Sequence, residues 1–156
     1  MAKATFAAGC FWGVEDAFRQ VEGVTLTAVG YIDGTTRNPS YKEVCTGRTG
    51  HAEAVEIDFD PARVSYLELL ATFWNSHDPT TVNRQGPDVG SQYRSVVFFH
   101  DAGQEKDARD SKAVLTEKGV FKRPIVTEIV PATEFYKAED YHQQYFEKQG
   151  SRSCHI

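Results

Sequence analysis

The sequence contains few cysteines and no long uncharged segment. Its 156 residues include cysteines only at positions 10, 45 and 154, and an odd number of such widely spaced thiols does not make a disulfide framework. The longest uncharged run, residues 4–14, has 11 residues and is too short to span a bilayer. A basic start and a small-residue cleavage site are also missing, so no signal peptide is indicated. We therefore expect a cytoplasmic protein whose cysteines remain reduced.

Motifs typical of several functional classes are also missing. The five histidines are scattered and no C-x-x-C pair accompanies them, which argues against a zinc site. There is no G-x-S-x-G motif, no phosphate-binding glycine loop and no dinucleotide fingerprint. The net charge of −5 argues against nucleic acid or an anionic membrane as the main partner. We expect no metal and no bound cofactor, and a monomer is the default.

The hydrophobic pattern predicts one domain in which strands and helices alternate. Strands are expected at residues 3–9, 24–32, 55–59, 96–99 and 125–130. Helices are expected at residues 11–21, 65–73, 101–119 and 138–146, the second of them opened by the capping box Ser65-x-x-Glu68. The first six elements follow the order β-α-β-β-α-β of the ferredoxin-like unit. The predicted fold class is therefore α+β, a single-domain two-layer sandwich with a ferredoxin-like core in a mixed sheet, two long loops and a mobile C-terminal tail.

Cys10 lies between an expected strand and an expected helix. In that position the thiol meets the first free N–H groups of the helix, where the helix macrodipole favours the thiolate. Gly9 and Gly13 flank the cysteine and allow a tight turn. The aromatic residues Phe11 and Trp12 that follow it are typical of a pocket wall. The alternative is a small buried cysteine with a purely structural role.

The two long polar loops, at 33–50 and 77–92, carry further candidates. Loops of that length are usually functional or disordered. Tyr41 lies in the first loop, whereas Asp88 lies in the second and Tyr93 at its end. Glu53, at the start of the third strand, shares a strand face with apolar residues, and burial would raise its pKa and make it a general acid near neutral pH. Alternatively, Glu53 bends out to solvent at the end of its strand.

Six segments of the chain resemble the type A peptide methionine sulfoxide reductases. They occur in collinear order and span nearly the whole sequence: GCFWG at 9–13, NPSYKEVC at 38–45, GHAEAV at 50–55, FWNSHDPT at 73–80, RQGPDVGSQYRS at 84–95 and AEDYHQQY at 138–145. Several of these segments are long, and chance is a poor explanation for them.

The resemblance implies an enzyme that reduces the S epimer of methionine sulfoxide, free or in peptides and proteins, and so repairs oxidative damage. Cys10 would attack the sulfoxide sulfur and become a sulfenic acid. Glu53 would supply the proton. Tyr41 and Tyr93 would hydrogen-bond the sulfoxide oxygen, with Asp88 as a supporting polar residue.

The resemblance also implies a binding wall and a recycling route. Phe11 and Trp12 would receive the S-methyl group. Cys154, in the tail 150–156 that follows a catalytic domain over residues 1–149, would form a disulfide with the oxidised Cys10, and thioredoxin, or dithiothreitol in vitro, would reduce it. The tail lacks the Asn-Pro and Gly-Tyr pairs that commonly precede the family's recycling cysteine.

Three other interpretations accompany this one. Cys45 is expected to be a packed or loop thiol, and His51 to support the site rather than act as a base. A different thiol enzyme, such as a cysteine peroxidase, would be oxidised faster by peroxide than by methionine sulfoxide. A peptide-binding module would bind oxidised peptide without consuming reductant.

Overall fold

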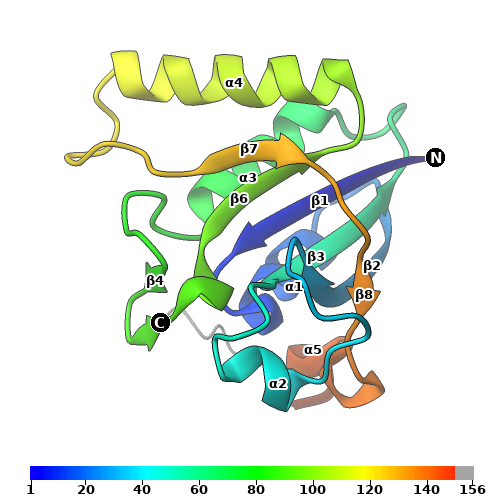
Figure 1. The fold of residues 1–156 in the computed structure, drawn as a ribbon. Helices are drawn as coiled ribbons and strands as arrows, with labels where there is room; N and C mark the ends of the chain where they lie inside the picture. The colour runs from blue at the N-terminus through cyan, green and yellow to red at the C-terminus, as the bar shows by residue number, and fades with distance from the viewer. Residues whose placement is uncertain (150–156) are drawn as a thin grey trace.

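A six-stranded sheet forms the centre of the protein in the computed structural model, which describes residues 1–149 (Figure 1). Its strands are β1 (Ala2–Ala8), β2 (Val24–Ile32), β3 (Ala52–Phe59), β6 (Ser95–Phe99), β7 (Glu128–Pro131) and β8 (Tyr136–Lys137). The helices are α1 (Phe11–Arg19), α2 (Tyr41–Cys45), α3 (Tyr66–Asn75), α4 (Ala102–Glu117) and α5 (Tyr145–Gln149). A separate hairpin pairs β4 (Arg84–Gln85) with β5 (Asp88–Val89), and 3₁₀ turns are formed by η1 (Ser91–Tyr93) and η2 (Asp140–His142).

The strand order β7-β6-β1-β3-β2-β8 contains the ferredoxin-like arrangement. Its central four strands are antiparallel and follow the chain order fourth, first, third, second. β7 adds in parallel to β6, so the sheet is mixed. The predicted α+β fold with a ferredoxin-like core is confirmed.

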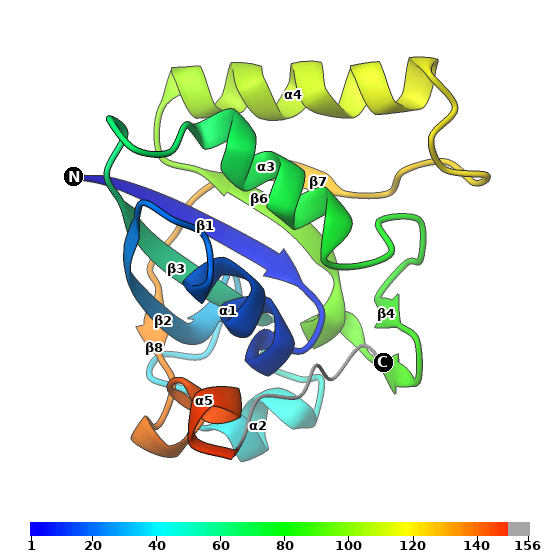
Figure 2. The same ribbon diagram turned by 180° about the vertical axis from the view of Figure 1, so that it is seen from behind.

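Helices α1 and α3 cover one face of the sheet (Figure 2). The core beneath them is aromatic: the ring of Phe6 on β1 lies 5.1 Å from that of Phe18 on α1 and 5.2 Å from that of Phe73 on α3. On the other face, residues 132–135 cross from β7 at one edge to β8 at the other (Figure 1). Ala132 and Phe135 pack there against small and β-branched side chains of the sheet. Both faces of the sheet are therefore covered near its centre.

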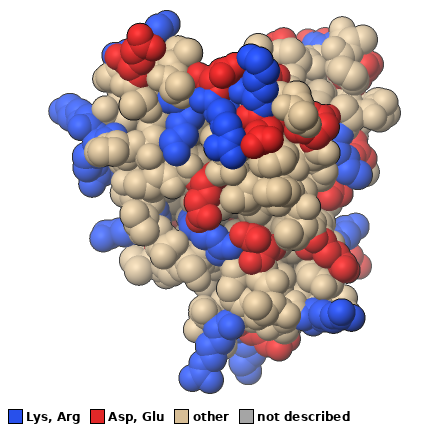
Figure 3. Space-filling model, turned by 45° about the horizontal axis from the view of Figure 1, so that its top comes forward, with Lys and Arg blue, Asp and Glu red and all other residues tan. Residues whose placement is uncertain are grey.

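Local sequence signals explain where the longer helices begin. Ser65 and Glu68 form the predicted capping box of α3, in which the Ser65 hydroxyl accepts a hydrogen bond from the Glu68 backbone N–H. The Asp101 side chain accepts one from the Gln104 N–H at the start of α4. Basic and acidic side chains are intermixed on the face that α4 presents (Figure 3), including ion pairs between residues one turn apart.

The secondary structure differs from the prediction in three segments: the two predicted loops and the predicted terminal helix. The first loop contains α2, and the second contains the β4–β5 hairpin and η1. The helix expected at 138–146 is replaced by η2 and the short α5, because side chains of this segment hydrogen-bond β2 instead of completing a helix. The expected mobile tail 150–156, with Cys154, lies outside the residues that the structure describes.

The register of the sheet brings the ends of three strands together. β1 is antiparallel to β3, with Phe6 opposite Val55, so the same register continued places Glu53 opposite Ala8 at the end of β1. β1 is also antiparallel to β6, with Ala8 opposite Ser95. The residues that follow β1, begin β3 and precede β6 therefore meet at one end of the sheet.

Candidate active site

Cys10 is the N-cap residue of α1, as predicted. Gly9 before it has φ 93°, a left-handed conformation that glycine adopts without steric cost, and this turn reverses the chain from β1 into the helix. Cys10 is 9% exposed. Cys10 is therefore a buried residue that keeps a small exposed area.

Glu53 lies beside Cys10 and is 1% exposed. Its Oε1 accepts a hydrogen bond from the backbone N–H of Phe11 at 3.3 Å, so the carboxyl group faces the first turn of α1. Its Oε2 accepts a second one from Nε2 of Gln92 at 2.9 Å. The face assigned to Glu53 from the sequence is the buried one, and the solvent-exposed alternative is wrong.

The surroundings of Glu53 set its protonation. Burial raises the pKa of Glu53 to about 7, against the hydrogen bonds from Gln92 and Phe11, which lower it, while the negative charge of Asp88 adds to the rise. Near neutral pH the carboxyl group is thus present in both forms. It can give up a proton, and the resulting carboxylate keeps two hydrogen-bond donors.

Tyr41 and Tyr93 remain protonated phenols at neutral pH. Burial is the largest cause that raises the pKa of Tyr41. The negative charge of Glu53 and a hydrogen bond to Cys45 raise it further. Burial is also the largest cause that raises the pKa of Tyr93. The negative charges of Glu53 and Asp88 raise it further, and Cys45 and Cys10 add smaller effects in the same direction. Both phenols therefore keep their protons close to the carboxyl group of Glu53, whose charge acts on both.

Asp88 belongs to the short hairpin rather than to the sheet. It lies in β5, opposite Gln85 of β4, and is half-buried. Its influence on the pKa values of Glu53 and Tyr93 places its charge in the same cluster. The structure therefore brings together Cys10, Glu53 and the three polar residues that the sequence singled out.

An aromatic wall adjoins this cluster. Phe11 is buried, with its ring 5.7 Å from that of Tyr31 and 6.3 Å from that of Tyr41. The half-buried Trp12 stacks on Tyr145 at 3.9 Å. Phe11 and Trp12 thus belong to a group of aromatic rings that extends into the C-terminal segment, and their expected role in binding the S-methyl group stays a prediction.

Several supporting residues were missed from the sequence. The Trp12 indole N–H donates to Nδ1 of the buried His142 at 2.9 Å, and burial lowers the pKa of His142, so the ring is neutral at pH 7. Glu139 accepts hydrogen bonds from the Tyr31 hydroxyl at 2.9 Å and from the Tyr41 backbone N–H at 3.1 Å. The segment around residue 142 is rich in aromatic residues, but its polar residues follow no recognisable spacing.

His51 holds a loop in place. Its Nδ1 accepts a hydrogen bond from the Gly34 N–H at 3.0 Å, and its Nε2–H donates to the Thr36 carbonyl at 2.6 Å. Both ring nitrogens are occupied by backbone groups, so His51 cannot take a proton from a thiol. Its expected supporting role agrees with this geometry.

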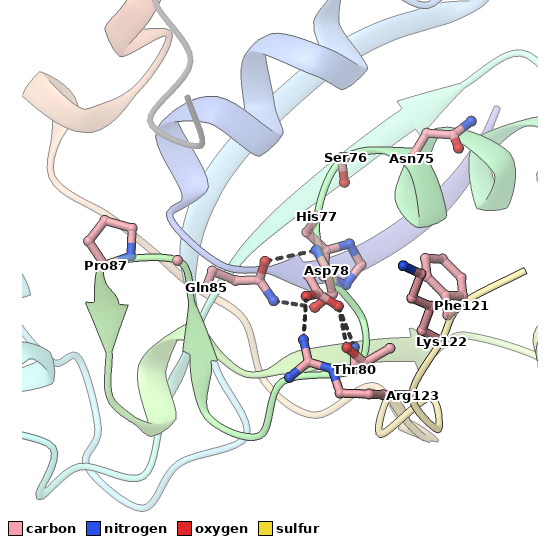
Figure 4. Close-up of a pocket in the computed structure, with 11 residues that line it drawn as sticks. Asn75, Ser76, His77, Asp78, Thr80, Gln85, Pro87, Phe121, Lys122 and Arg123 are labelled. Atoms are coloured by element: carbon pink, nitrogen blue, oxygen red, sulfur yellow. Dashed lines mark hydrogen bonds and ion pairs between the residues drawn. The ribbon is translucent and has the colours of Figure 1, made fainter.

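A separate cavity of about 710 Å³ lies between the β4–β5 hairpin, the end of α3 and residues 121–123 (Figure 4). Asp78 is one of its lining residues and forms an ion pair with Arg123 at 3.2 Å. The backbone N–H of Asp78 donates a hydrogen bond to Oε1 of Gln85 at 2.9 Å. Cys10 and Glu53 do not line it. The cavity is therefore separate from the Cys10 and Glu53 pair.

No group of three or more metal-ligating side chains occurs within residues 1–149. In the same range no helix is long and apolar enough to cross a membrane.

Known proteins are similar to this chain in sequence and in fold. The family described as peptide methionine sulfoxide reductase matches residues 2–156. The peptide methionine sulfoxide reductase MsrA of Methanoculleus marisnigri is 62% identical over 154 residues, which cover 99% of this chain and 94% of the relative. Mxr1 from Saccharomyces cerevisiae in its reduced form aligns with a TM-score of 0.91 at 37% identity, over 99% of this chain and 88% of that one. Mxr1 in complex with Trx2 aligns with a TM-score of 0.65 at 26% identity, over 92% and 84% of the two chains.

Proposed function

The chain belongs to the peptide methionine sulfoxide reductase family, and on this premise we propose how its own residues reduce methionine sulfoxide. The protein is a thiol-dependent oxidoreductase. A sulfoxide sulfur is a poor electrophile until its oxygen receives a proton, so the reaction needs a thiolate and an acid in one site. Cys10 and Glu53 form that pair. The catalytic domain comprises residues 1–149, and residues 150–156 form the recycling tail.

The Cys10 thiolate attacks the sulfoxide sulfur while Glu53 gives its proton to the sulfoxide oxygen. The attack forms a bond between the two sulfur atoms, and the S–O bond then breaks. The hydroxyl group passes to the Cys10 sulfur as the sulfur–sulfur bond breaks, so the products are methionine and a Cys10 sulfenic acid. Glu53, now a carboxylate, takes a proton back from solvent. Tyr41 and Tyr93 donate hydrogen bonds to the oxygen during transfer, and Asp88 helps to keep the proton on Glu53.

The aromatic wall selects the epimer. With the oxygen directed at Glu53, the S-methyl group of the S epimer faces Phe11 and Trp12. In the R epimer the methyl group and the oxygen exchange places, which brings a strong dipole against the aromatic rings without a hydrogen-bond donor. We therefore expect reduction of the S epimer alone.

Recycling requires a second thiol and an external reductant. The Cys154 thiol condenses with the Cys10 sulfenic acid, releasing water and forming a disulfide. A thioredoxin reduces this disulfide, in line with the complex that Mxr1 forms with Trx2. Dithiothreitol replaces it in vitro. We propose that the protein acts as a cytoplasmic monomer on oxidised proteins and peptides, with no resident cofactor or metal and with no nucleic-acid or membrane partner.

One observation carries this proposal: the pKa of the buried Glu53 carboxyl lies at about 7, and its Oε1 binds the N–H next to Cys10. The test is turnover of the separate S and R epimers of a methionine sulfoxide peptide with dithiothreitol. Wild type should reduce the S epimer, Cys10→Ser should have no activity, and Glu53→Gln should lose about 100-fold or more, as expected for loss of a general acid.

Glu56→Gln is the matched control. Glu56 lies on the opposite face of β3, where its carboxylate pairs with Nζ of Lys3 at 3.3 Å, so this variant should keep wild-type turnover. Equal losses in Glu56→Gln and Glu53→Gln would contradict an acid role for Glu53. Failure of the wild type on both epimers would contradict the proposed reaction.

A further inference from the structure

Gln92 is a polar residue in the core that none of the roles above uses. It is the middle residue of η1, between Gly90 and Tyr93, and is 4% exposed. A buried amide is costly unless its polar atoms find partners. The partners of its Nε2 are Oε2 of Glu53 at 2.9 Å and Sγ of Cys45 at 3.5 Å. This amide therefore touches the acid directly.

The Glu53 carboxyl group is held from two directions. Its Oε1 is bound by the Phe11 N–H, which belongs to the backbone of α1 and cannot rotate away. Its Oε2 is bound by Gln92, which comes from a different segment. With both oxygens held, the plane of the carboxyl group is fixed, and a proton on Glu53 must use a position that the two donors leave open.

Cys45 orients the amide of Gln92. An amide can turn either its nitrogen or its oxygen toward a carboxyl group, and only the nitrogen can donate to the ionised form. The Cys45 sulfur at the end of α2 accepts a hydrogen bond from the same Nε2. The sulfur thus favours the orientation in which nitrogen faces Glu53.

We propose that Gln92 is a positioning residue of the reduction, whose amide holds the Glu53 carboxyl group and stabilises the carboxylate left after proton transfer, and that Cys45 keeps this amide correctly turned. The proposal rests on the proposed function, in which Glu53 is the acid. It also gives Cys45, expected from the sequence to be a packed or loop thiol, a definite contact.

Loss of the Gln92 amide should change both the pH at which Glu53 titrates and how readily Glu53 releases its proton. Burial raises the pKa of Glu53 and the Gln92 hydrogen bond opposes that rise. Without the amide, the pKa of Glu53 should move further up by about one unit, because a hydrogen bond to a charged group contributes about a tenfold factor or more. The acid would then be protonated over a wider pH range but would release its proton less readily.

The test replaces Gln92 by Met, which has similar volume and no donor. The ionisation of Glu53 is read directly from the infrared carboxyl band of protein labelled with ¹³C-glutamate, identified by its loss in Glu53→Gln. The single-turnover rate on the S epimer is measured over the same pH range. Gln92→Met should raise the infrared midpoint by about one pH unit, shift the alkaline limb of the rate profile equally and lower the maximal rate by about tenfold.

Gln104→Met provides the matched control. Gln104 is 6% exposed and makes two backbone hydrogen bonds, to the His100 N–H and to the Lys3 carbonyl, at the opposite end of β1 from Cys10. Its loss should destabilise the fold similarly and leave the Glu53 midpoint unchanged. An unchanged midpoint in Gln92→Met, or an equal shift in Gln104→Met, would overturn the proposal.

Cys45→Ala tests the orienting contact. This variant should raise the Glu53 midpoint by less than Gln92→Met, and should add no shift in the Gln92→Met background, because the contact acts only through the amide. No shift in the single variant, or an additional shift in the double variant, would overturn this part. A wild type that reduces neither epimer refutes the proposed function, whereas an active wild type with an unmoved Gln92→Met midpoint refutes only the role of Gln92.

Discussion

The raised pKa of Glu53 predicts that the acid costs the protein stability. The folded protein holds the Glu53 proton up to a pKa of about 7, whereas the ordinary value of 4.5 applies to the unfolded chain. Between these two values the folded state binds more protons than the unfolded state, so the fold loses stability as pH rises from 4.5 through 7. The difference of about 2.5 pKa units corresponds to about 3 kcal/mol of unfolding free energy at the alkaline end.

Glu53→Gln isolates this contribution, because the amide has nearly the same shape and does not ionise. Relative to wild type, the variant should gain about 2.5 kcal/mol of unfolding free energy between about pH 5 and about pH 8.5, because part of the effect is already present at pH 5. Urea unfolding followed by tryptophan fluorescence, under reducing conditions at each pH, measures the difference. Other titrating groups, among them His142 with its lowered pKa, cancel because both proteins contain them.

A control variant and the size of the pH effect test whether Glu53 titrates near pH 7 in the folded protein. Glu56→Gln, on the opposite face of the same strand, where the side chain is 24% exposed, should show no gain of this size. If the free-energy difference between Glu53→Gln and wild type is the same at both ends of the range, Glu53 does not titrate near pH 7 in the fold, and its assignment as the acid loses its basis. If the gain appears while activity is lost, the same buried carboxyl group both destabilises the protein and performs the chemistry.

Two further predictions concern the wall and the tail. Trp12→Phe loses the hydrogen bond to His142 and most of the stack on Tyr145, so steady-state kinetics on the S epimer should show a rise in KM of about two- to tenfold; an unchanged KM would exclude the indole from substrate binding. Cys154→Ser should form about one equivalent of methionine per protein without reductant and lose turnover with thioredoxin, which an assay of methionine release would show; undiminished turnover would point to another resolving thiol.

The regular part of the fold could be predicted because its signals are local. The capping box at Ser65 and Glu68 and the alternation of apolar residues along β3 are set by the sequence within one element, and both occur in the structure. The inward direction of Glu53 follows from the same alternation. A Ser-x-x-Glu signal was also present at Ser40 and Glu43 and could have revealed α2, but this helix has five residues and one buried side chain, and so lacks an apolar stripe.

The C-terminal segment could not be predicted because its contacts are distant in the sequence. Gln143 uses its side-chain amide to bond both the N–H and the carbonyl of Val29, which replaces a strand partner of β2 with a side chain. The buried Glu15 of α1 accepts hydrogen bonds from the backbone and side chain of Gln144. These tertiary contacts outweigh the helical propensity of the segment, and no local sequence pattern predicts them.

The position of the site follows from topology. Because β1 is antiparallel to both β3 and β6, the end of β1 must meet the start of β3 and the approach to β6, whatever the loops contain. Cys10 follows β1, Glu53 begins β3, and Gln92 precedes β6. In a strand order that separated β1 from either neighbour, the thiol, the acid and the amide could not touch. The ferredoxin-like order thus explains why three residues spread over 83 positions, from 10 to 92, form one site.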